Sequence, residues 1–186
     1  IISGDVRLEM SREALDRITS CRKYLDNKMR IPGELIYGVN TGFGALYNVA
    51  IGDRELEQLQ KNLVMSHACG VGEQVPREIV RLMLFLKIQS LSYGYSGVQP
   101  DTVIRLMDFF NQGIYPVVYE QGSLGASGDL APLAHLSLPL IGLGEVDYQG
   151  QRMTGEVLNR MMGWEPITLQ SKEGLALLNG TQFMSA

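Results

Sequence analysis

The sequence predicts a mainly α-helical protein. Several long stretches carry apolar residues at helical spacing, and residues typical of helix ends stand at their borders. One short segment has the weak alternation of a hairpin. The 186 residues are 45% hydrophobic, which is enough for a sizeable core in one domain, or in one domain and part of a second.

The first predicted helix begins after Ser11, whose hydroxyl can cap it, and runs to about Met29. Its apolar face holds Leu15, Ile18 and Leu25. Pro32-Gly33 breaks the pattern. Residues 37–52 are rich in Gly and Asn and predict a long, exposed loop of a kind that often carries function.

Two helices are predicted next. Asp53 caps the first of them, and Gly70 and Gly72 end it. Its apolar stripe holds Leu56, Leu59, Leu63 and His67. Pro76 opens the second, which runs to about Leu91 and has apolar residues on every side: Ile79, Val80, Leu82, Met83, Leu84, Phe85, Leu86 and Ile88. A helix of this kind is predicted to be buried.

Two more helix starts follow. Pro100-Asp101 begins one helix, which Gly113 closes as a C-cap. Asp129 precedes an apolar run over residues 130–141 with Pro132 near its start, and an acid followed by a proline and apolar residues indicates a helix N-terminus.

The last third of the chain predicts smaller elements. Residues 145–154 alternate weakly around Gln149-Gly150, which favours a small hairpin. Thr154 caps a short helix that ends at Gly163. The chain shows no repeats and no low-complexity tract.

Composition excludes several functional classes. A net charge of −4 argues against a nucleic-acid partner. Cys21 and Cys69 lie far apart, and with two histidines in the chain we expect no metal site and reduced thiols in a cytoplasmic protein. No stretch reaches about eighteen uninterrupted apolar residues, and the first residues lack the pattern of a signal peptide, so we expect no membrane partner.

The tripeptide Ala126-Ser127-Gly128 offers unusual chemistry. If the Gly128 nitrogen attacks the Ala126 carbonyl carbon, a five-membered ring closes. Loss of two waters, one from the Ser127 hydroxyl, leaves an electrophilic methylidene-imidazolone. Glycine presents an unhindered nitrogen and a permissive backbone. Small-residue runs are ordinarily turns, but this one stands at the positive end of a predicted helix, which favours a group that accepts electron density.

Four blocks of the sequence carry a family resemblance. They are Tyr37–Gly44, Asn62–Gly70, Gly122–His135 and Lys172–Thr181. In this order they resemble the active-site loop, the substrate-selectivity helix, the electrophile signature and the asparagine block of the aromatic amino acid ammonia-lyases and aminomutases. The resemblance runs from about Val6 to Ala186, which is nearly the whole chain.

The resemblance implies a fumarase/aspartase-like helical architecture. Residues 1–110 would form an N-terminal helical domain with the active-site loop 37–52, and residues 111–186 would hold the electrophile segment and the start of a central helical bundle. Family members are far longer than this chain, so we expect it to be an N-terminal portion. The complete enzyme is expected to be a homotetramer with active sites built from several subunits.

The resemblance also assigns roles to single residues. It makes Tyr37 the base that collects the β-proton, for which its site must lower a phenol pKa from about 10. Asn179 assists ring formation and binds the substrate amine, and His67 contacts the substrate's side-chain ring. Asp129 aids cyclisation besides standing at a helix N-terminus. His135 is taken as structural.

Each of these residues also has a structural interpretation. Without the resemblance, Tyr37 is a loop aromatic packed on the core. His67 is a core histidine, and Asn179 is a helix-terminating residue before Gly180. The glycines at 38–44 and 122–128 give only weak phosphate or dinucleotide fingerprints, because the following Lys-Ser/Thr or the preceding strand is missing.

Histidine is the preferred substrate, because Ser66-His67 and the block ending at Thr181 are most similar to bacterial histidine ammonia-lyases. The products would be urocanate and ammonia, and the one cofactor would be the ring made from residues 126–128. The alternatives are a tyrosine ammonia-lyase, a tyrosine 2,3-aminomutase, or a non-catalytic folding or assembly module. In the last case the ring can be unformed, and the arginine that binds the substrate carboxylate lies outside the chain.

Overall fold

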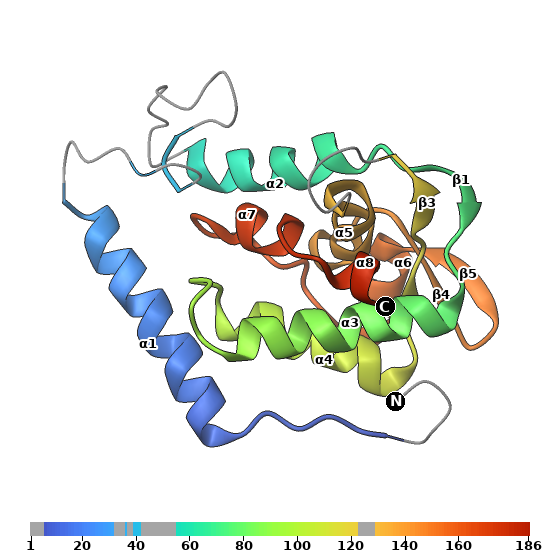
Figure 1. The fold of residues 1–186 in the computed structure, drawn as a ribbon, viewed down its shortest axis with the longest axis horizontal. Helices are drawn as coiled ribbons and strands as arrows, with labels where there is room; N and C mark the ends of the chain where they lie inside the picture. Colours follow the sequence, from blue (N-terminus) through green and yellow to red (C-terminus); the bar gives the residue numbers. More distant parts are fainter. Residues whose placement is uncertain (1–5, 32–35, 37–38, 42–54, 123–128) are drawn as a thin grey trace.

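The computed structural model describes residues 6–31, 36, 39–41, 55–122 and 129–186 (Figure 1). The predicted mainly helical class is confirmed. In chain order the elements are α1 (Arg12–Met29), α2 (Leu56–His67), β1 (Val71–Gln74), α3 (Arg77–Ser92), α4 (Pro100–Gln112), β2 (Tyr115–Pro116), β3 (Tyr119–Gln121), α5 (Leu130–Ser137), the 3-10 helix η3 (Leu138–Ile141), β4 (Glu145–Tyr148), β5 (Gln151–Thr154), α6 (Gly155–Met162), α7 (Glu173–Leu178) and α8 (Gln182–Ser185).

Helix ends follow the prediction where the sequence has a clear cap. The Ser11 hydroxyl accepts a hydrogen bond from the Ala14 N–H at 3.2 Å. The Thr154 hydroxyl accepts one from the Val157 N–H at 3.3 Å. Gly113 closes α4 with a φ of 68°, which a glycine adopts at little cost. Local capping chemistry therefore places these ends.

Helix α2 differs from its prediction at both ends. It begins at Leu56 after Glu55, which makes no side-chain cap bond, and Asp53 lies outside the described residues. It ends at His67, because the chain then enters strand β1. The four residues of β1 are all exposed and do not alternate, so the sequence carried no strand signal there.

Two small antiparallel sheets complete the fold. β1 pairs with β3, and the second sheet has the order β2-β4-β5. The predicted hairpin is confirmed as β4–β5, with Gln149 and Gly150 at positive φ between the strands. The strand β2 was missed, because a two-residue strand leaves no periodicity to detect.

The predicted exposed loop over residues 37–52 lies mostly outside the described residues. Two residues of it that are described, Val39 and Thr41, are 3% and 1% exposed. The prediction of exposure was wrong for these two. Composition alone does not show which loop residues face the interior.

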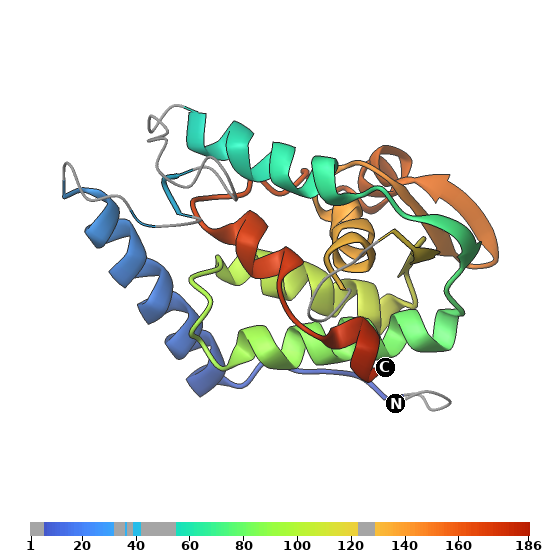
Figure 2. The same cartoon turned by 45° about the horizontal axis from the view of Figure 1, so that its top comes forward.

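The core lies around α3, α4 and α5. Helices α3 and α4 pack on each other, and α5 lies against α2, α7 and α8 (Figures 1 and 2). The prediction that α3 is buried on every side is confirmed for one stripe only, whose buried apolar residues are Val80, Met83, Leu84, Ile88 and Leu91. Four other residues of the predicted apolar set are partly exposed, namely Ile79, Leu82, Phe85 and Leu86. One cluster joins Leu84 of the first predicted domain to Leu140 of the second, so the division near residue 110 remains a prediction. No helix in the described part of the chain is both long and apolar enough to cross a bilayer.

Candidate active site

Two predicted site residues stand at the same end of two neighbouring helices. His67 is the last residue of α2, and Asn179 directly follows α7. These helices lie side by side and run in the same direction (Figures 1 and 2). The N–H of Gly174 donates a hydrogen bond of 2.9 Å to the Gln60 side chain near their beginning.

A small apolar cluster holds these helix ends together. It consists of Leu63 of α2, Ala134 of α5 and Leu178 of α7, with Ala68 packed against it. Ala68 is next to His67 in the chain, Leu178 is next to Asn179, and Ala134 is next to His135. The cluster thus fixes the backbone beside each of these polar residues.

The described residues that flank the tripeptide converge on the same place. Ala126, Ser127, Gly128 and Tyr37 lie outside the described residues, so their arrangement stays a prediction. Gly122 lies against Gly70 so closely that a Cβ on Gly122 would be 2.7 Å from the Gly70 Cα. The Sγ of Cys69 lies 3.4 Å from the Gly122 carbonyl oxygen. One flank of the tripeptide is therefore next to the turn that follows His67.

Asp129 anchors the other flank. It is 1% exposed, and its Oδ2 accepts hydrogen bonds from the N–H groups of Phe183 at 2.8 Å and Met184 at 3.2 Å. It stands at the start of α5 as predicted but makes no side-chain bond to that helix. Its carboxylate instead binds the first turn of α8, four residues after Asn179.

The hydrogen bonds of His67 define its tautomer. Nδ1 lies 2.8 Å from the carbonyl oxygen of Leu63 and 3.3 Å from the Ser66 hydroxyl. Because a carbonyl oxygen can only accept, Nδ1 carries the proton. With one proton on the ring, held at Nδ1, Nε2 is the acceptor. His67 is partly exposed, so this nitrogen can accept a hydrogen bond from a ligand.

Asn179 ends α7 in an extended conformation, with a φ of −86° and a ψ of 140°. Its N–H donates to the Leu175 carbonyl at 3.0 Å, and its side-chain Nδ2 donates to the same oxygen at 3.2 Å. Its predicted position as a helix terminator is confirmed. The residue is exposed, so its amide can meet a ligand without rearrangement of the core.

His135 is a structural neighbour of the site. Its Nε2 accepts a hydrogen bond of 2.9 Å from the Gly70 N–H, so this nitrogen is unprotonated. Its ring packs edge-on against Tyr119, with 5.1 Å between the ring centroids. Burial lowers the pKa of His135, because the charged form loses hydration. The ring holds the turn after His67, in keeping with its predicted structural role.

Lys87 was missed by the sequence reasoning. It is 1% exposed on α3, and its Nζ donates hydrogen bonds to the carbonyl of Asn179 at 2.8 Å and of Ala176 at 3.0 Å. Burial lowers its pKa to about 7, against the opposing charge of Asp129. The available signal was the one lysine of α3, which stands directly after the apolar run Leu82–Leu86.

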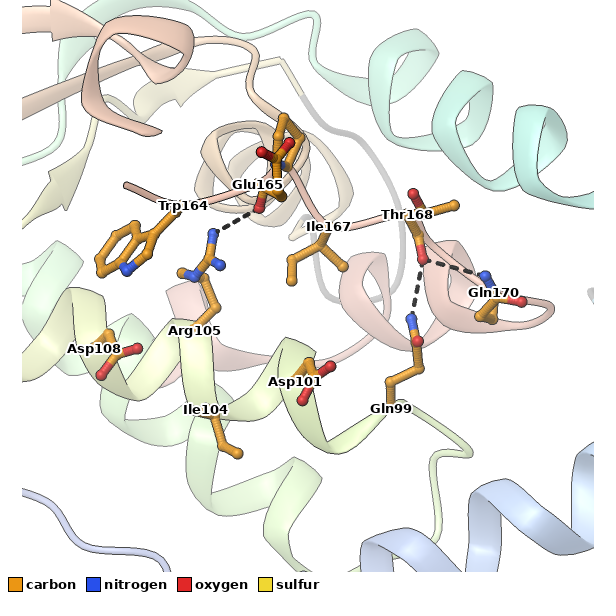
Figure 3. A pocket seen from close by; sticks show the side chains of 11 residues that line it. Gln99, Asp101, Ile104, Arg105, Asp108, Trp164, Glu165, Ile167, Thr168 and Gln170 are labelled. Carbon is orange, nitrogen blue, oxygen red and sulfur yellow. Dashed lines mark hydrogen bonds between the residues drawn. The ribbon is translucent and has the colours of Figure 1, made fainter. Parts of the chain in front are cut away.

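A separate cavity of about 370 Å³ lies between α4 and residues 164–170 (Figure 3). Arg105 stacks over the Trp164 ring at 4.4 Å and donates to the Glu165 carbonyl at 3.2 Å. Arg105 thus binds other residues that line the cavity, and the lining contains none of the predicted site residues. In the described part of the chain, no group of three or more His, Cys, Asp or Glu side chains could hold a metal ion.

Comparison with known proteins identifies the family. The sequence profile described as "Aromatic amino acid lyase" matches residues 1–186. The chain belongs to this family. It is 53% identical over 174 residues to a histidine ammonia-lyase of Geobacillus thermodenitrificans (strain NG80-2), a match that covers 94% of this chain and 34% of the relative. The chain therefore spans about a third of the length of the curated relatives it matches.

Solved structures of family members share the fold. Histidine ammonia-lyase from Trypanosoma cruzi superposes with a TM-score of 0.87 at 40% identity, covering 98% of this chain and 35% of that one. A tyrosine aminomutase mutant with bound ligand gives a TM-score of 0.91 at 32% identity, covering 99% of this chain and 34% of that one. The fumarase/aspartase-like helical architecture is thus confirmed.

Proposed function

We propose that the protein deaminates L-histidine to urocanate and ammonia. The observation that carries this proposal is that His67 and Asn179 stand at the C-terminal ends of α2 and α7, both of which pack on α5, while the described residues on either side of Ala126-Ser127-Gly128 contact the segments next to them. The identity of about half of the residues with histidine ammonia-lyases supports the choice of substrate.

The described flanks fit a cyclised tripeptide. Gly122 is packed against Gly70 without room for a Cβ, and Asp129 is buried and bound to α8. A segment held at both ends in this way can press the Ala126 carbonyl towards the Gly128 nitrogen. Once formed from residues 126–128, the ring would supply the electrophilic chemistry that turns the amine nitrogen of the substrate into a leaving group.

Three side chains have separate roles in the proposed reaction. His67 accepts a hydrogen bond from the substrate imidazole through Nε2, which orients the ring. Asn179 binds the amine through its amide, at a helix end exposed to ligand. Tyr37 collects the β-proton, and its pKa must lie below the usual value near 10 for it to act near neutral pH.

An acceptor at His67 suits a phenol as well as an imidazole. A tyrosine ammonia-lyase or tyrosine 2,3-aminomutase is therefore the second candidate, and the fold similarity to a tyrosine aminomutase favours keeping it. We further propose a cytoplasmic homotetramer with a separate helical domain over residues 1–110. Residues 1–186 alone are expected to be inactive, and turnover by this isolated stretch would contradict that expectation.

Replacement of Ser127 tests the proposed chemistry. Ser127→Ala removes the hydroxyl that must be eliminated, so the complete gene product should lose at most one water from its calculated mass, instead of two, and should not deaminate its substrate. Intact-protein mass spectrometry and a urocanate assay measure the two effects. Ser123→Ala, four residues earlier in the same signature, is the matched control and should retain ring and activity. Full activity of the wild type at unmodified mass would overturn the mechanism.

A further inference from the structure

The lysine in the core of α3 needs a physical explanation. A buried ammonium loses its hydration, and an apolar side chain of similar volume would avoid that loss. Lys87 is nevertheless 1% exposed among the apolar residues of α3. Its presence is explained by the groups that its Nζ contacts.

Those groups are backbone carbonyls at the C-terminal end of α7. The last carbonyls of a helix lack partners within it, and the C-terminal end carries partial negative charge. The Nζ of Lys87 binds the carbonyls of Ala176 and Asn179 at 3.0 and 2.8 Å. The ammonium group thus caps α7 from a different helix and fixes the peptide group of Asn179.

Asp129 fixes the chain on the other side of Asn179. Its Oδ2 binds the N–H groups of Phe183 and Met184, so residues 180–182 connect a residue bound by Lys87 to residues bound by Asp129. The two charges act on each other, since the negative charge of Asp129 opposes the loss of the Lys87 proton. The backbone around Asn179 is therefore held from both directions.

We propose that Lys87 is a positioning residue for Asn179, which it holds through the backbone carbonyl so that the amide faces the substrate amine. The role rests on the proposed function, because it presumes that Asn179 binds substrate. Lys87 itself touches no substrate. Its loss should change turnover more than it changes the folded state.

The test compares variants of the complete gene product. Lys87→Met removes the donor and the charge, Lys87→Gln keeps amide hydrogens without charge, and Lys87→Arg keeps both. Leu91→Ala, one turn further along α3, is the matched control, because Leu91 is equally buried and has no hydrogen-bonding side chain. The readouts are kcat and KM for L-histidine per ring-bearing molecule, the unfolding midpoint, and amide hydrogen exchange of residues 176–184.

We expect Lys87→Met to lower kcat by about a hundredfold, as small misplacements of a reacting group do, with a smaller change in KM and faster exchange over residues 176–184. Lys87→Arg should restore most of kcat. If Lys87→Met does not fold, Lys87→Gln takes its place. An unchanged kcat overturns the proposal, as does an equal loss of kcat and exchange protection in Leu91→Ala. If the wild type deaminates no amino acid, the proposed function fails, and the exchange data still decide whether Lys87 holds Asn179.

Discussion

The carboxylate of Asp129 accepts a hydrogen bond of 2.8 Å from the backbone N–H of Phe183, which is 54 residues further along the chain. This contact joins the residue after the Ala-Ser-Gly tripeptide to the segment that follows Asn179. Two parts of the proposed active site, separate in sequence, thus share one buried charge.

Asp129→Asn tests how much this contact contributes to the free energy of unfolding. The amide keeps an acceptor oxygen and loses the charge, and hydrogen bonds to charged groups contribute about 1.5–3 kcal/mol. We expect the free energy of unfolding in urea to fall by about 1–3 kcal/mol. Asp16→Asn, at an exposed position of α1, is the control and should stay within about 0.5 kcal/mol of wild type. Equal stabilities of both variants would contradict the structural role of Asp129.

Gly122 and Gly150 form a matched pair. Both have positive φ, at 141° and 78°, but a Cβ on Gly122 would lie 2.7 Å from the Gly70 Cα, whereas one on Gly150 meets nothing within 4 Å. Gly122→Ala should therefore destabilise the protein by about 1–3 kcal/mol more than Gly150→Ala. Thermal unfolding of the two variants measures the difference. Similar midpoints would show that the close approach at Gly70 is unimportant.

His135 predicts a pH dependence of stability. Burial lowers its pKa below the unfolded value near 6.5, so the folded state binds fewer protons. Its contribution to the free energy of unfolding is complete above about pH 6.5 and is lost as the pH falls through the lowered folded pKa. His135→Gln can accept from the Gly70 N–H without titrating, so its stability should fall less between about pH 7.5 and 5. The free energy of unfolding in urea is measured for both proteins at the two pH values. An equal fall in wild type and His135→Gln would show that His135 is not the origin of the pH dependence.

His67→Leu tests substrate orientation. The change removes the Nε2 acceptor at a partly exposed helix end, so the unfolding midpoint should change little. Loss of the hydrogen bond to a bound imidazole should lower kcat/KM for L-histidine by about ten- to a hundredfold. Met65→Leu, at an exposed position of the same turn, serves as the control. Unaltered kcat/KM in His67→Leu would remove His67 from the substrate contacts.

Local signals in the sequence predicted much of the fold. Ser11, Thr154 and Gly113 act at short range, so their caps follow from neighbouring residues alone. The hairpin around Gln149-Gly150 is local in the same sense. Strand β1 could not be predicted, because its pairing with β3 depends on residues about fifty positions away and its own side chains are all exposed.

In the candidate site, too, contacts between residues far apart in the sequence could not be predicted. The family resemblance pointed to His67, Asn179 and Asp129, and the structure brings the elements that carry them together. Resemblance did not show that Asp129 binds α8 rather than its own helix, nor that Lys87 binds the Asn179 carbonyl. Both contacts join distant helices, and no spacing along one helix encodes them.

The proposed deamination of L-histidine is tested most directly by identifying what the complete protein forms from each amino acid. Purified protein is incubated separately with L-histidine and L-tyrosine, and the products are resolved by chromatography and ultraviolet absorbance. We expect urocanate and ammonia from L-histidine. Coumarate or β-tyrosine from L-tyrosine, without urocanate from L-histidine, would contradict it.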